Sequence, residues 1–517
     1  MSPRLVRFVP LVLAALAGLL QALSLAWPGH GQPQWWLQLL SLAGLVVLLQ
    51  RAGGWRRGAV LGGVFATAWL TATFWWLFIS MHVYGGLASP LAALAVLLLA
   101  GFLALYYALA AGLWCGAAGR PWRDGVLFAL LWLGAELLRN SLFTGFPWGA
   151  GGYAHVDGPL APLAPWIGVY GVGAVAAWLA WLVALLARRP VQGSWRYWIA
   201  LAASAGLLAA CNVHHTASVR PAGAGAPRLQ VALLQGNIPQ DEKFEGGTGI
   251  PVALEWYGRR LLDTQAQLVV APETAIPLLP PQLPEGYLEA LRDAFAQGPR
   301  AALIGIPLGS FEEGYTNSVL GFRPGAGGAA YRYHKHHLVP FGEFIPPLFK
   351  WFTRMMNIPL GDFNRGDVGQ PSFAWEGQRL APNICYEDLF GEELGARFAD
   401  AATAPTIFVN LSNIGWFGDT VAIDQHLQIS RMRALEFERP MIRATNTGAT
   451  VIIDRFGRVT HALPRHTRGV LAGEVEGGTT LTPFARWVSR FGLAPLWALA
   501  LAAALVAARA GRRRLQP

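Results

Sequence analysis

The sequence predicts a multi-pass membrane protein in which an α/β domain is inserted between the seventh and eighth helices of an eight-helix transmembrane bundle. Apolar residues make up 54% of the 517 residues, and they concentrate in the first two hundred residues and the last thirty. Arginines cluster beside the apolar segments, a pattern typical of membrane topology. The middle of the chain has the composition of a globular domain. The predicted domains are residues 1–215, 225–478 and 488–517.

Eight apolar segments are candidates for helices that cross a bilayer core about 30 Å thick, which needs about 20 residues each. The fifth segment is short and contains Glu136. The first is long enough to cross, and no convincing cleavage motif follows Trp27, so we predict a helix there and not a signal peptide. The eight segments are Leu5–Trp27, Gln34–Gln50, Gly58–Ser80, Ser89–Cys115, Gly125–Leu138, Trp166–Ala187, Tyr197–Cys211 and Phe491–Ala508.

Arginines lie at alternate ends of these segments. Clusters precede the first, follow the eighth, and lie between the second and third, the fourth and fifth, and the sixth and seventh. The connections 28–33, 81–87 and 143–165 contain no Lys or Arg. Because positively charged connections stay in the cytoplasm, we expect both termini there and the α/β domain on the other side. Arg486 and Arg490 are weak exceptions.

The formal net charge of +10 does not indicate nucleic-acid binding. Fourteen arginines flank apolar segments, which exceeds the whole net charge, so the rest of the chain is slightly acidic. The basic character is therefore a signal of topology and not a phosphate-binding surface. These residues are Arg4, Arg7, Arg51, Arg56, Arg57, Arg120, Arg123, Arg188, Arg189, Arg196, Arg509, Arg512, Arg513 and Arg514.

From Leu229 onwards, short apolar runs rich in β-branched residues alternate with helical patterns, which predicts a layered α/β domain. Proline is tolerated in a helix's opening turn, so Pro284 is expected at the start of the first helix. Predicted strands are Leu229–Leu234, Gln267–Ala271, Ala301–Ile306, Ser318–Phe322, Ala381–Ile384, Thr406–Asn410 and Met441–Thr445, followed by a hairpin over Thr450–Thr460; predicted helices are Pro284–Ala296, Gly391–Ala399 and Ile423–Arg439.

Cys385 is the only cysteine in the predicted α/β domain, because Cys115 and Cys211 lie in or at the end of apolar segments. Outside the cytoplasm, structural cysteines normally occur in pairs. Cys385 is therefore either a buried, inert residue or a nucleophile. A disulfide to Cys211 has little support.

Two further segments contain residues that could take part in catalysis with Cys385. Glu273 ends an apolar run after Pro272, where α/β sites are commonly built, although a glutamate there can also cap a surface loop. Lys335 stands among His334, His336 and His337. A lone lysine is usually solvated, and the spacing of the histidines fits neither a helical metalloprotease pattern nor a closed zinc site. We therefore predict no metal and no other cofactor.

Together Glu273, Lys335 and Cys385 are suited to covalent catalysis. A thiol attacks a carbonyl well only as thiolate. A carboxylate can take the thiol proton and later exchange it with the leaving group or the incoming nucleophile. A lysine ammonium can stabilise the oxyanion of the tetrahedral intermediate.

The ordered set Glu273, Lys335 and Cys385 resembles the Glu-Lys-Cys triad of the nitrilase superfamily, whose fold is a nitrilase-like αββα sandwich. Longer strings resemble, within that superfamily, the membrane-embedded apolipoprotein N-acyltransferase family, and the resemblance covers essentially the whole chain. The strings are His337–Glu343, Cys385–Glu387, Trp416–Gly418, Gln425–Gln428, Arg431–Glu436 and Arg443–Asn446.

The resemblance implies an inner-membrane enzyme with a periplasmic catalytic domain. Cys385 would take the sn-1 acyl chain of a phospholipid, typically phosphatidylethanolamine, and pass it to the α-amine of a diacylglyceryl-cysteine at a lipoprotein's N-terminus. Glu273 is implied as general base, Lys335 as oxyanion stabiliser and Glu343 as a second essential carboxylate. Tyr386 and Glu387 are implied as supporting residues, whereas Ile414 departs from the family, which more often has an acidic residue there.

The lipid substrate agrees with an apolar, aromatic stretch over Leu348–Leu360, whose methionines suit adaptable contact with acyl chains. We predict an arm that rests on the bilayer; a partly buried loop is the alternative. Glu136 and Arg139 are costly near lipid, so they pair or line the substrate path, although Arg139 can also anchor the interface. The substrate-binding residues expected are Trp351, Phe352, Met355, Met356, Trp416 and Arg139.

Two other functions share these features. A membrane-anchored nitrilase-type amidase would use the same three residues, with water resolving the thioester, but it would need one anchor at most. A transporter or lipid-binding protein with an inert domain predicts a broken triad, whereas all three residues are present.

Overall fold

The computed structural model describes residues 3–119, 121–186, 228–325, 330–345 and 362–515, together with 202, 206 and 209. The chain forms two compact units. One comprises Met1–Phe78, Ser89–Arg220 and Leu493–Pro517, and the other comprises Ile79–Ala88 and Pro221–Gly492. Each is described by itself.

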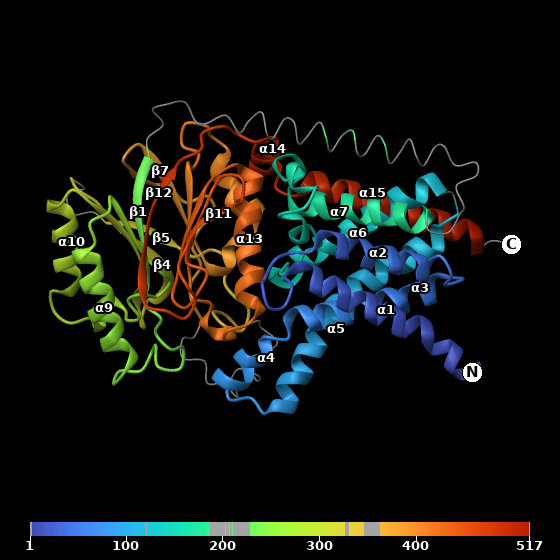
Figure 1. The fold of residues 1–517 in the computed structure, drawn as a ribbon, viewed down its shortest axis with the longest axis horizontal. Helices are drawn as coiled ribbons and strands as arrows, with labels where there is room; N and C mark the ends of the chain where they lie inside the picture. Colours follow the sequence, from blue (N-terminus) through green and yellow to red (C-terminus); the bar gives the residue numbers. More distant parts are fainter. Residues whose placement is uncertain are drawn as a thin grey trace. The chain divides into compact units, whose positions relative to one another are not determined.

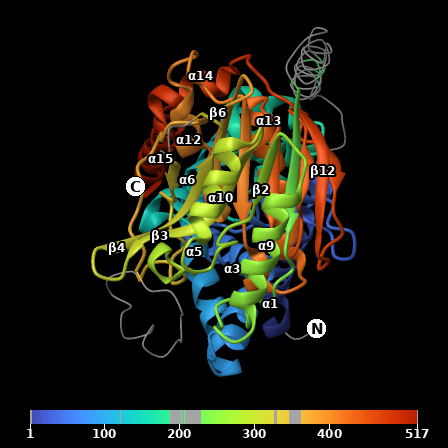
Figure 2. The same ribbon diagram turned by 90° about the vertical axis from the view of Figure 1, so that its left-hand side faces the viewer.

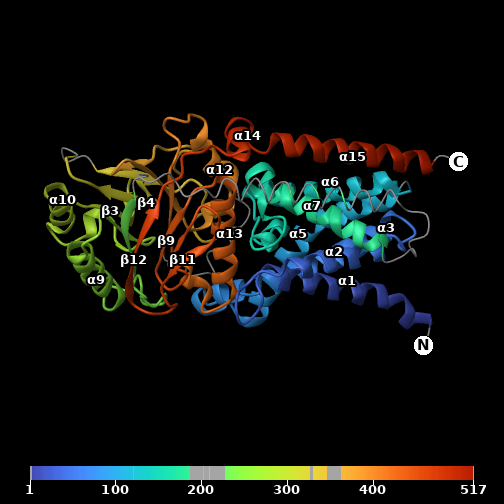
Figure 3. The ribbon, with the colours of Figure 1, turned by 45° about the horizontal axis from the view of Figure 1, so that its top comes forward.

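The first unit is helical. Its last helix, α15, comes from the far end of the chain and lies beside α5 and α6 (Figure 3). The long helices are α1 (Pro3–Leu25), α2 (Trp35–Leu49), α3 (Trp55–Phe74), α5 (Ser89–Ala117), α6 (Pro121–Ser141), α7 (Ala164–Leu186) and α15 (Ala494–Leu515); short 3-10 turns are η2 (Leu142–Thr144), η3 (Gly151–His155) and η4 (Ala161–Leu163).

Five of the described helices are long and apolar enough to cross a membrane. A sixth span results if α3 and the following Leu77–Tyr84, which are bent by 60° relative to each other, count as one. The predicted span Gln34–Gln50 is a helix of 15 residues, about 22 Å long, so it is shorter than a span. The predicted span Tyr197–Cys211 lies outside the described residues. Eight spans are therefore not all recovered.

Small residues set the close packing of α3 on α5. A Cβ placed on Gly62 would lie 2.5 Å from the Cβ of Ala111, which is closer than real carbon atoms approach. Without a strong hydrophobic drive between helices in lipid, such close backbone approach supplies much of the packing energy. A larger side chain at Gly62 would push these two helices apart.

The second unit contains two six-stranded sheets, in the orders β12-β1-β2-β3-β4-β5 and β11-β10-β9-β8-β7-β6. In each sheet three consecutive central strands run parallel, β1-β2-β3 and β7-β8-β9, and the outer pairs are antiparallel. The strands are β1 (Arg228–Gln235), β2 (Leu268–Ala271), β3 (Ala301–Ser310), β4 (Gly314–Phe322), β5 (Tyr331–His334), β6 (Phe373–Trp375), β7 (Gln378–Ile384), β8 (Ile407–Ser412), β9 (Met441–Thr445), β10 (Val451–Ile453), β11 (Val459–Ala462) and β12 (Gly469–Glu476).

Alternation along the central strands explains the layers. Successive side chains of a strand point to opposite faces. In β2, Leu268 and Val270 join a core shared by both sheets, whereas Val269 and Ala271 join a second core on the outer face. In β8, Val409 faces the shared core. Both faces of the central strands are buried, as expected for parallel strands.

Helices cover both outer faces, which gives four layers in the order helix, sheet, sheet, helix. On one side Tyr257 of α9 and Phe295 of α10 pack on the first sheet, and both helices stand in front of its strands in Figure 2. On the other side Phe437 of α13 packs on the second sheet (Figure 1). The helices are α9 (Gly249–Asp263), α10 (Tyr287–Gln297), α12 (Gly391–Gly395), α13 (Val421–Phe437) and α14 (Pro483–Phe491), with 3-10 turns η5 (Pro280–Gln282), η7 (Cys385–Leu389), η8 (Ala396–Phe398) and η9 (Ile414–Phe417).

All the predicted strands and helices of this unit are present, with ends that differ by a few residues, and β9 coincides with its prediction. The placement of Pro284 was wrong: α10 begins at Tyr287, after the left-handed Gly286. Three strands and two helices were not predicted, namely β5, β6, β12, α9 and α14.

A segment from the N-terminal half of the chain belongs to this second unit. Residues 79–88 contain the end of α4 (Leu77–Ile79) and the π-helix η1 (Ser80–Tyr84). The ring of Tyr84 meets the ring of Trp416 edge to face, with centroids 5.8 Å apart. Residues 79–88 therefore contact the rest of the second unit at the turn η9.

Candidate active site

Glu273 lies in a tight turn directly after β2. Thr274 adopts a positive φ of 47°, a conformation that non-glycine residues rarely adopt. A Cβ on Gly305 of the neighbouring strand β3 would collide with the carbonyl oxygen of Pro272 and lie 2.7 Å from Cα of Glu273. The glycine therefore allows this turn to fold back against β3, which sets where the Glu273 carboxylate points.

Lys335 follows β5, the edge strand of the same sheet. Its backbone N–H donates to the carbonyl of Asn317 in β4 at 2.8 Å. Its ammonium is buried and donates to the carboxylate of Glu343 at 2.9 Å and to Glu273 Oε1 at 3.3 Å. One lysine is thus shared by the buried carboxylate of Glu273 and the half-buried carboxylate of Glu343.

Asn317 and Asn413 complete the bonding of these carboxylates. The amide nitrogen of Asn317 donates to Glu273 Oε1 at 2.8 Å and to Glu343 Oε1 at 2.7 Å. The backbone N–H of Asn413 donates to Glu273 Oε2 at 2.8 Å. Both oxygens of Glu273 therefore accept hydrogen bonds, which stabilise its ionised form.

The charges of the cluster are set by these contacts. Burial alone would raise the pKa of Glu273, but the ammonium groups of Lys335 and Lys243, with the two asparagine donors, lower that pKa below its ordinary value. Burial likewise opposes the charge of Lys335, but the carboxylates of Glu273 and Glu343 outweigh it and raise the pKa of Lys335. Glu273 is therefore a carboxylate and Lys335 an ammonium at neutral pH.

Cys385 lies directly after β7, in the second sheet. Its φ of 51° is positive, so the chain turns sharply at this residue. The carbonyl oxygen of Cys385 accepts a hydrogen bond from His426 Nε2 at 3.2 Å and faces the amide of Asn410 at 3.4 Å. A strained conformation of this kind at a sheet edge is common for catalytic nucleophiles.

The Cys385 thiol is a neutral group in this structure. Burial raises its pKa to about 12, and the negative charge of Glu273 adds to the rise, whereas Lys335 and the Ser412 side chain lower it. The influence of Glu273 and Lys335 on this pKa places both charges near the thiol. Cys385 therefore needs a base to become a nucleophile, and Glu273 is ionised and close.

Glu387 joins the segment of Lys335 to the turn of Cys385. Its Oε1 accepts from the backbone N–H of His336 at 2.7 Å, and its Oε2 accepts from the N–H of Ile384 at 2.6 Å and from the hydroxyl of Tyr333 at 2.8 Å. One buried carboxylate thus fixes two chain segments that come from different sheets. Glu387 therefore ties the Lys335 segment to the Cys385 turn.

A second charged cluster lies behind the nucleophile. His426 Nε2 is 2.9 Å from Asp388 Oδ1, and Arg443 donates to His426 Nδ1 at 2.8 Å and to Ser430 Oγ at 2.6 Å. Because arginine can only donate, Nδ1 of His426 accepts and Nε2 carries the proton. Burial and Arg443 lower the pKa of His426 despite Asp388, so the ring is neutral and donates to the carbonyl of Cys385.

The histidines beside Lys335 diverge. His334 Nδ1 lies 2.8 Å from Thr316 Oγ1, His336 Nδ1 lies 2.7 Å from the carbonyl oxygen of Gly366, and His337 Nδ1 lies 2.9 Å from Glu393 Oε1. Within the described part of the chain, no group of three or more His, Cys, Asp or Glu side chains is placed to hold a metal ion. The three histidines therefore bond to three different partners and do not converge on one site.

Two family models match the chain. Residues 17–182 match the apolipoprotein N-acyltransferase N-terminal domain, and residues 230–483 match the carbon-nitrogen hydrolase family. The apolipoprotein N-acyltransferase of Verminephrobacter eiseniae is 63% identical over 504 residues, which cover 93% of this chain and 92% of the relative. The chain belongs to the apolipoprotein N-acyltransferase family.

The family likeness extends to other bacteria. The apolipoprotein N-acyltransferase of Ralstonia nicotianae is 48% identical and covers 92% of this chain and 89% of its own length. Among solved structures, an amidase from Nesterenkonia sp. is similar over 54% of this chain and 99% of its own, with 16% identity and a TM-score of 0.36. The match to the carbon-nitrogen hydrolase family over residues 230–483, together with the two sheets, shows that the α/β unit has a nitrilase-like fold, and several apolar helices precede it.

The structure brings together, from strand ends of both sheets, five of the residues predicted from the sequence: Glu273, Lys335, Glu343, Cys385 and Glu387. Tyr386, next to the nucleophile, is buried, and its ring contacts those of Phe390 and His337 at centroid distances of 5.4 and 5.7 Å. Tyr386 therefore packs the turn η7 against Phe390 and against the segment that follows Lys335.

The predicted substrate contacts are distributed differently. Trp416 lies in η9, three residues after Asn413, so it stands close in sequence to a donor of Glu273. Trp351, Phe352, Met355 and Met356, together with the predicted bilayer arm Leu348–Leu360, lie outside the described residues. A role for these side chains in substrate binding remains a prediction.

Arg139 lies in the helical unit and pairs with Glu136 at 2.9 Å, one of the two alternatives expected for these residues. Its guanidinium also donates to the hydroxyl of Tyr107 at 3.0 Å and to the carbonyls of Phe146 and Trp148 at 3.2 and 2.6 Å. These contacts hold the chain after α6 against the helices. Contact of Arg139 with substrate stays a prediction.

Sequence reasoning missed three residues of the site: Asn317, Asn413 and Lys243. Asn317 is a polar residue in the middle of a buried strand, and this pattern was a usable signal, because a buried amide needs polar partners. Asn413 bonds to Glu273 through its backbone N–H, so its side-chain type gave no signal of this contact. Lys243 stands beside Asp241 and Glu242 and reads as part of a solvated turn.

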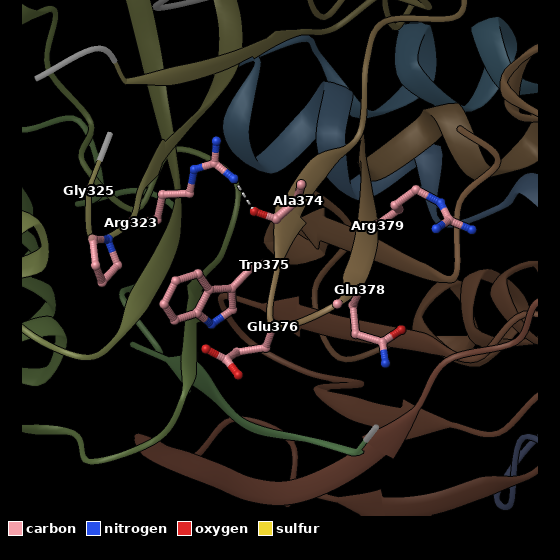
Figure 4. A pocket seen from close by; sticks show the side chains of 9 residues that line it. Arg323, Gly325, Ala374, Trp375, Glu376, Gln378 and Arg379 are labelled. Carbon is pink, nitrogen blue, oxygen red and sulfur yellow. Dashed lines mark hydrogen bonds between the residues drawn. The ribbon is translucent and has the colours of Figure 1, made fainter. Parts of the chain in front are cut away.

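A hollow of about 420 Å³ lies elsewhere, at the turn of the β6–β7 hairpin (Figure 4). Because Gln378 begins β7 and Cys385 follows its end, the hollow and the nucleophile lie about 20 Å apart along the strand. No predicted site residue lines it. Its lining is Arg323, Pro324, Gly325, Ala374, Trp375, Glu376, Gly377, Gln378 and Arg379.

Proposed function

We propose that this chain moves an acyl chain from a phospholipid to the α-amine of the N-terminal diacylglyceryl-cysteine of lipoproteins, through a thioester on Cys385. The observation that carries the proposal is the half-buried, neutral thiol of Cys385, whose pKa is shifted by the charges of Glu273 and Lys335, in a member of the apolipoprotein N-acyltransferase family. Each charge has a role in the two half-reactions.

The first half-reaction forms the thioester. Glu273 takes the proton of the Cys385 thiol, and the sulfur attacks the carbonyl carbon of the phospholipid's sn-1 ester. The carbonyl oxygen becomes an oxyanion, which the Lys335 ammonium stabilises. The C–O bond to glycerol then breaks, and the leaving oxygen takes the proton from Glu273, so that a lysophospholipid departs and an acyl-enzyme remains.

The second half-reaction resolves it. The α-amine of the acceptor, as the free base, attacks the thioester carbonyl while Glu273 takes one of its protons. The intermediate collapses, the C–S bond breaks, and the sulfur leaves as thiolate, which recovers the proton from Glu273. An amide has formed, and Glu273, Lys335 and Cys385 return to their starting states.

Glu343 and Glu387 act as positioning residues in this scheme. Glu343 holds Lys335 through a contact at 2.9 Å and is itself fixed by the N–H of Val339 at 2.8 Å. Without it, the Lys335 ammonium would have Glu273 as its carboxylate partner and would be drawn away from the oxyanion. Glu387 keeps the Lys335 segment and the Cys385 turn in register.

The membrane arrangement proposed here has eight spans, with both termini in the cytoplasm and the α/β unit, inserted between the seventh and eighth, in the periplasm. The alternation of arginine clusters supports this orientation. Phosphatidylethanolamine is the proposed acyl donor. Trp351, Phe352, Met355, Met356, Trp416 and Arg139 are the proposed substrate contacts.

The alternative is hydrolysis of the thioester by water, as in a membrane-anchored amidase. The same three residues would catalyse it, because the chemistry up to the acyl-enzyme is shared. The several apolar helices of this chain favour the lipid reaction, since an enzyme acting on soluble amides needs no more than one anchor.

The test uses the full-length protein purified in detergent and a phosphatidylethanolamine labelled in its sn-1 acyl chain. The protein should acquire a label that hydroxylamine removes, and a diacylglyceryl-cysteine peptide should then take up the label at its amine. Cys385→Ala should acquire none, whereas Cys115→Ala, which removes a cysteine of α5, should behave as the wild type.

Two outcomes would contradict the proposal. Label that persists in Cys385→Ala would exclude the thioester. Label that leaves the wild-type protein as free fatty acid in the presence of the peptide would favour the amidase.

A further inference from the structure

Lys243 is a second buried lysine beside Glu273. It lies in the turn between β1 and α9, and 1% of its surface is exposed, whereas its acidic neighbours Asp241 and Glu242 face solvent. Burial of a lysine ammonium costs several kcal/mol unless other groups compensate it. Because Lys243 is buried while the acids beside it are exposed, groups in the site must compensate the cost of burying its ammonium.

The partners of Lys243 are neutral oxygens of the Glu273 turn. Its Nζ donates to the carbonyl oxygen of Glu273 at 3.1 Å and to Thr274 Oγ1 at 2.7 Å. Thr274 Oγ1 in turn donates to the same carbonyl at 2.8 Å. The three groups close a hydrogen-bonded triangle around the residue whose φ is 47°. Among the described residues, Lys243 forms no ion pair.

The turn that holds Lys243 is fixed to the same part of the site. Gln240 Oε1 accepts from the side-chain nitrogen of Asn413 at 2.8 Å, and the backbone N–H of Asn413 donates to Glu273 Oε2 at 2.8 Å. The main chain and the carboxylate of Glu273 are thus both held through this turn. Lys243 holds the first and Asn413 the second.

We propose that Lys243 is a positioning residue of the acyl-transfer site, whose buried ammonium fixes the Glu273–Thr274 turn and keeps Glu273 ionised as the proton acceptor for Cys385. The inference rests on the proposed function. The charged and titratable groups whose fields act around Glu273 are Lys243, Lys335, Glu343, Cys385 and, from β9 of the second sheet, Arg443. The two lysines divide the work: Lys335 faces the carboxylates, and Lys243 lies behind the turn.

The division follows from the contacts. Lys335 shares its charge between Glu273 and Glu343, so part of its attraction is directed away from Glu273. Lys243 has no other carboxylate, so its field acts on Glu273 alone among the acids. Burial lowers the pKa of Lys243 to about 7, with Glu273 and Cys385 acting in the opposite direction, so the charge is present at pH 6 and below, where Glu273 needs it.

The test compares variants by the rate at which iodoacetamide alkylates Cys385 in the full-length protein, read by mass spectrometry at pH 6.5 and pH 4.5. This reaction also needs the thiol proton removed, but it needs no lipid. Loss of the Lys243 charge in Lys243→Met raises the pKa of Glu273, so the acidic limb moves to higher pH. The ratio of the alkylation rate at pH 6.5 to the rate at pH 4.5 should therefore be about threefold higher than in the wild type.

Thr274→Val is the matched variant, because it removes the two hydrogen bonds of Thr274 Oγ1 in the triangle and keeps the ammonium. Its rate should fall at both pH values while the ratio stays at the wild-type value. Arg259→Met on the exposed face of α9 should change neither. Where Lys243→Met loses its cooperative thermal transition, Lys243→Gln, which keeps a donor but no charge, should show the same raised ratio.

An unchanged ratio in Lys243→Met or Lys243→Gln, with only a lower rate, would reduce Lys243 to a structural residue and overturn the inference. An equal rise of the ratio in Thr274→Val would do the same. The labelled-phospholipid assay on the wild type separates the two ideas: absent label with a raised alkylation ratio contradicts the proposed function and leaves the role of Lys243 standing.

Discussion

Two largely buried clusters of charged residues act on different groups of Cys385. The cluster of Glu273, Lys335, Glu343 and Asn317 acts on the thiol, whereas the cluster of Asp388, His426, Ser430 and Arg443 acts on the main chain, through the bond from His426 to the Cys385 carbonyl. Both are buried and both contain oppositely charged pairs. They differ in which group faces the nucleophile.

The difference separates catalysis from support. In the second cluster the group nearest the nucleophile is a neutral imidazole, held between a carboxylate and a guanidinium. In the first, the nearest groups are an ionised base and an ammonium. Burial and charge are therefore insufficient to identify a catalytic group; what matters is whether a proton acceptor faces the reacting atom.

The largest effect should come from Glu273→Gln. The amide keeps the volume of the carboxylate but cannot take the thiol proton, and the pKa of Cys385 of about 12 leaves almost no thiolate. Formation of the thioester should fall by about a thousandfold. The measurement is the rate of hydroxylamine-labile labelling, with thermal unfolding as a check on the fold. A loss below tenfold would show that another group is the base.

Next in size is Arg443→Met in the supporting cluster. It leaves Asp388 buried without its guanidinium, so the protein should lose about 3 kcal/mol of stability. The expected result is a lower unfolding temperature with only a small change in the pH dependence of thioester formation. Arg443 acts on Glu273 and Cys385 through its charge alone, whereas Glu273 and Lys335 keep their hydrogen-bond partners. A shift of the acidic limb as large as that caused by loss of Lys243 would show that the two clusters are strongly coupled and that the division is wrong.

The wild-type pH profile sharpens the comparison further. The pKa of Glu273 is lowered in the folded protein, so Glu273 stays ionised below the ordinary glutamate value of about 4.3. Thioester formation should therefore be flat from pH 7 down to about 5 and fall only at lower pH, where the carboxylate gains its proton. A midpoint above 6 would assign the limb to a different group.

The smallest change is expected for Ser430→Ala. The Ser430 hydroxyl joins Asp388 to Arg443, accepting from the guanidinium at 2.6 Å. Its loss should cost about 1 kcal/mol of stability and leave the rate within about twofold. Thermal unfolding and labelling, measured on the same preparation, test this pair of values. A tenfold loss of rate without loss of stability would place Ser430 among the catalytic groups.

The elements with strong patterns could be predicted from the sequence. β9 coincides with the predicted Met441–Thr445 because its apolar, β-branched run is bounded by Pro440 and Asn446. β5 was missed because its four residues, Tyr331–His334, alternate aromatic and basic side chains and lie at a sheet edge. The helix α2 reads as a span by composition but is 15 residues long. The composition of this segment indicated an apolar helix, but the length of that helix depends on the tertiary structure.

The site was predictable in its residues and not in its connections. Glu273 and Cys385 each follow a strand that the patterns indicated, whereas Lys335 follows β5, which was missed. β2 and β5 belong to one sheet and β7 to the other. Their meeting depends on how the sheets face each other, and no local pattern contains that. Lys243 was missed for the same reason, since its burial depends on the Glu273 turn.

The segment Ile79–Ala88 has a consequence for how the α/β unit is made. This unit is discontinuous, since the segment is synthesised more than a hundred residues before Pro221. During translation η1 is therefore made well before η9, and the contact between Tyr84 and Trp416 can form only after η9 has been synthesised. A recombinant fragment that starts at Pro221 would lack this ring partner, and its Trp416 would face water, so a soluble catalytic domain cut from this protein would be an incomplete one.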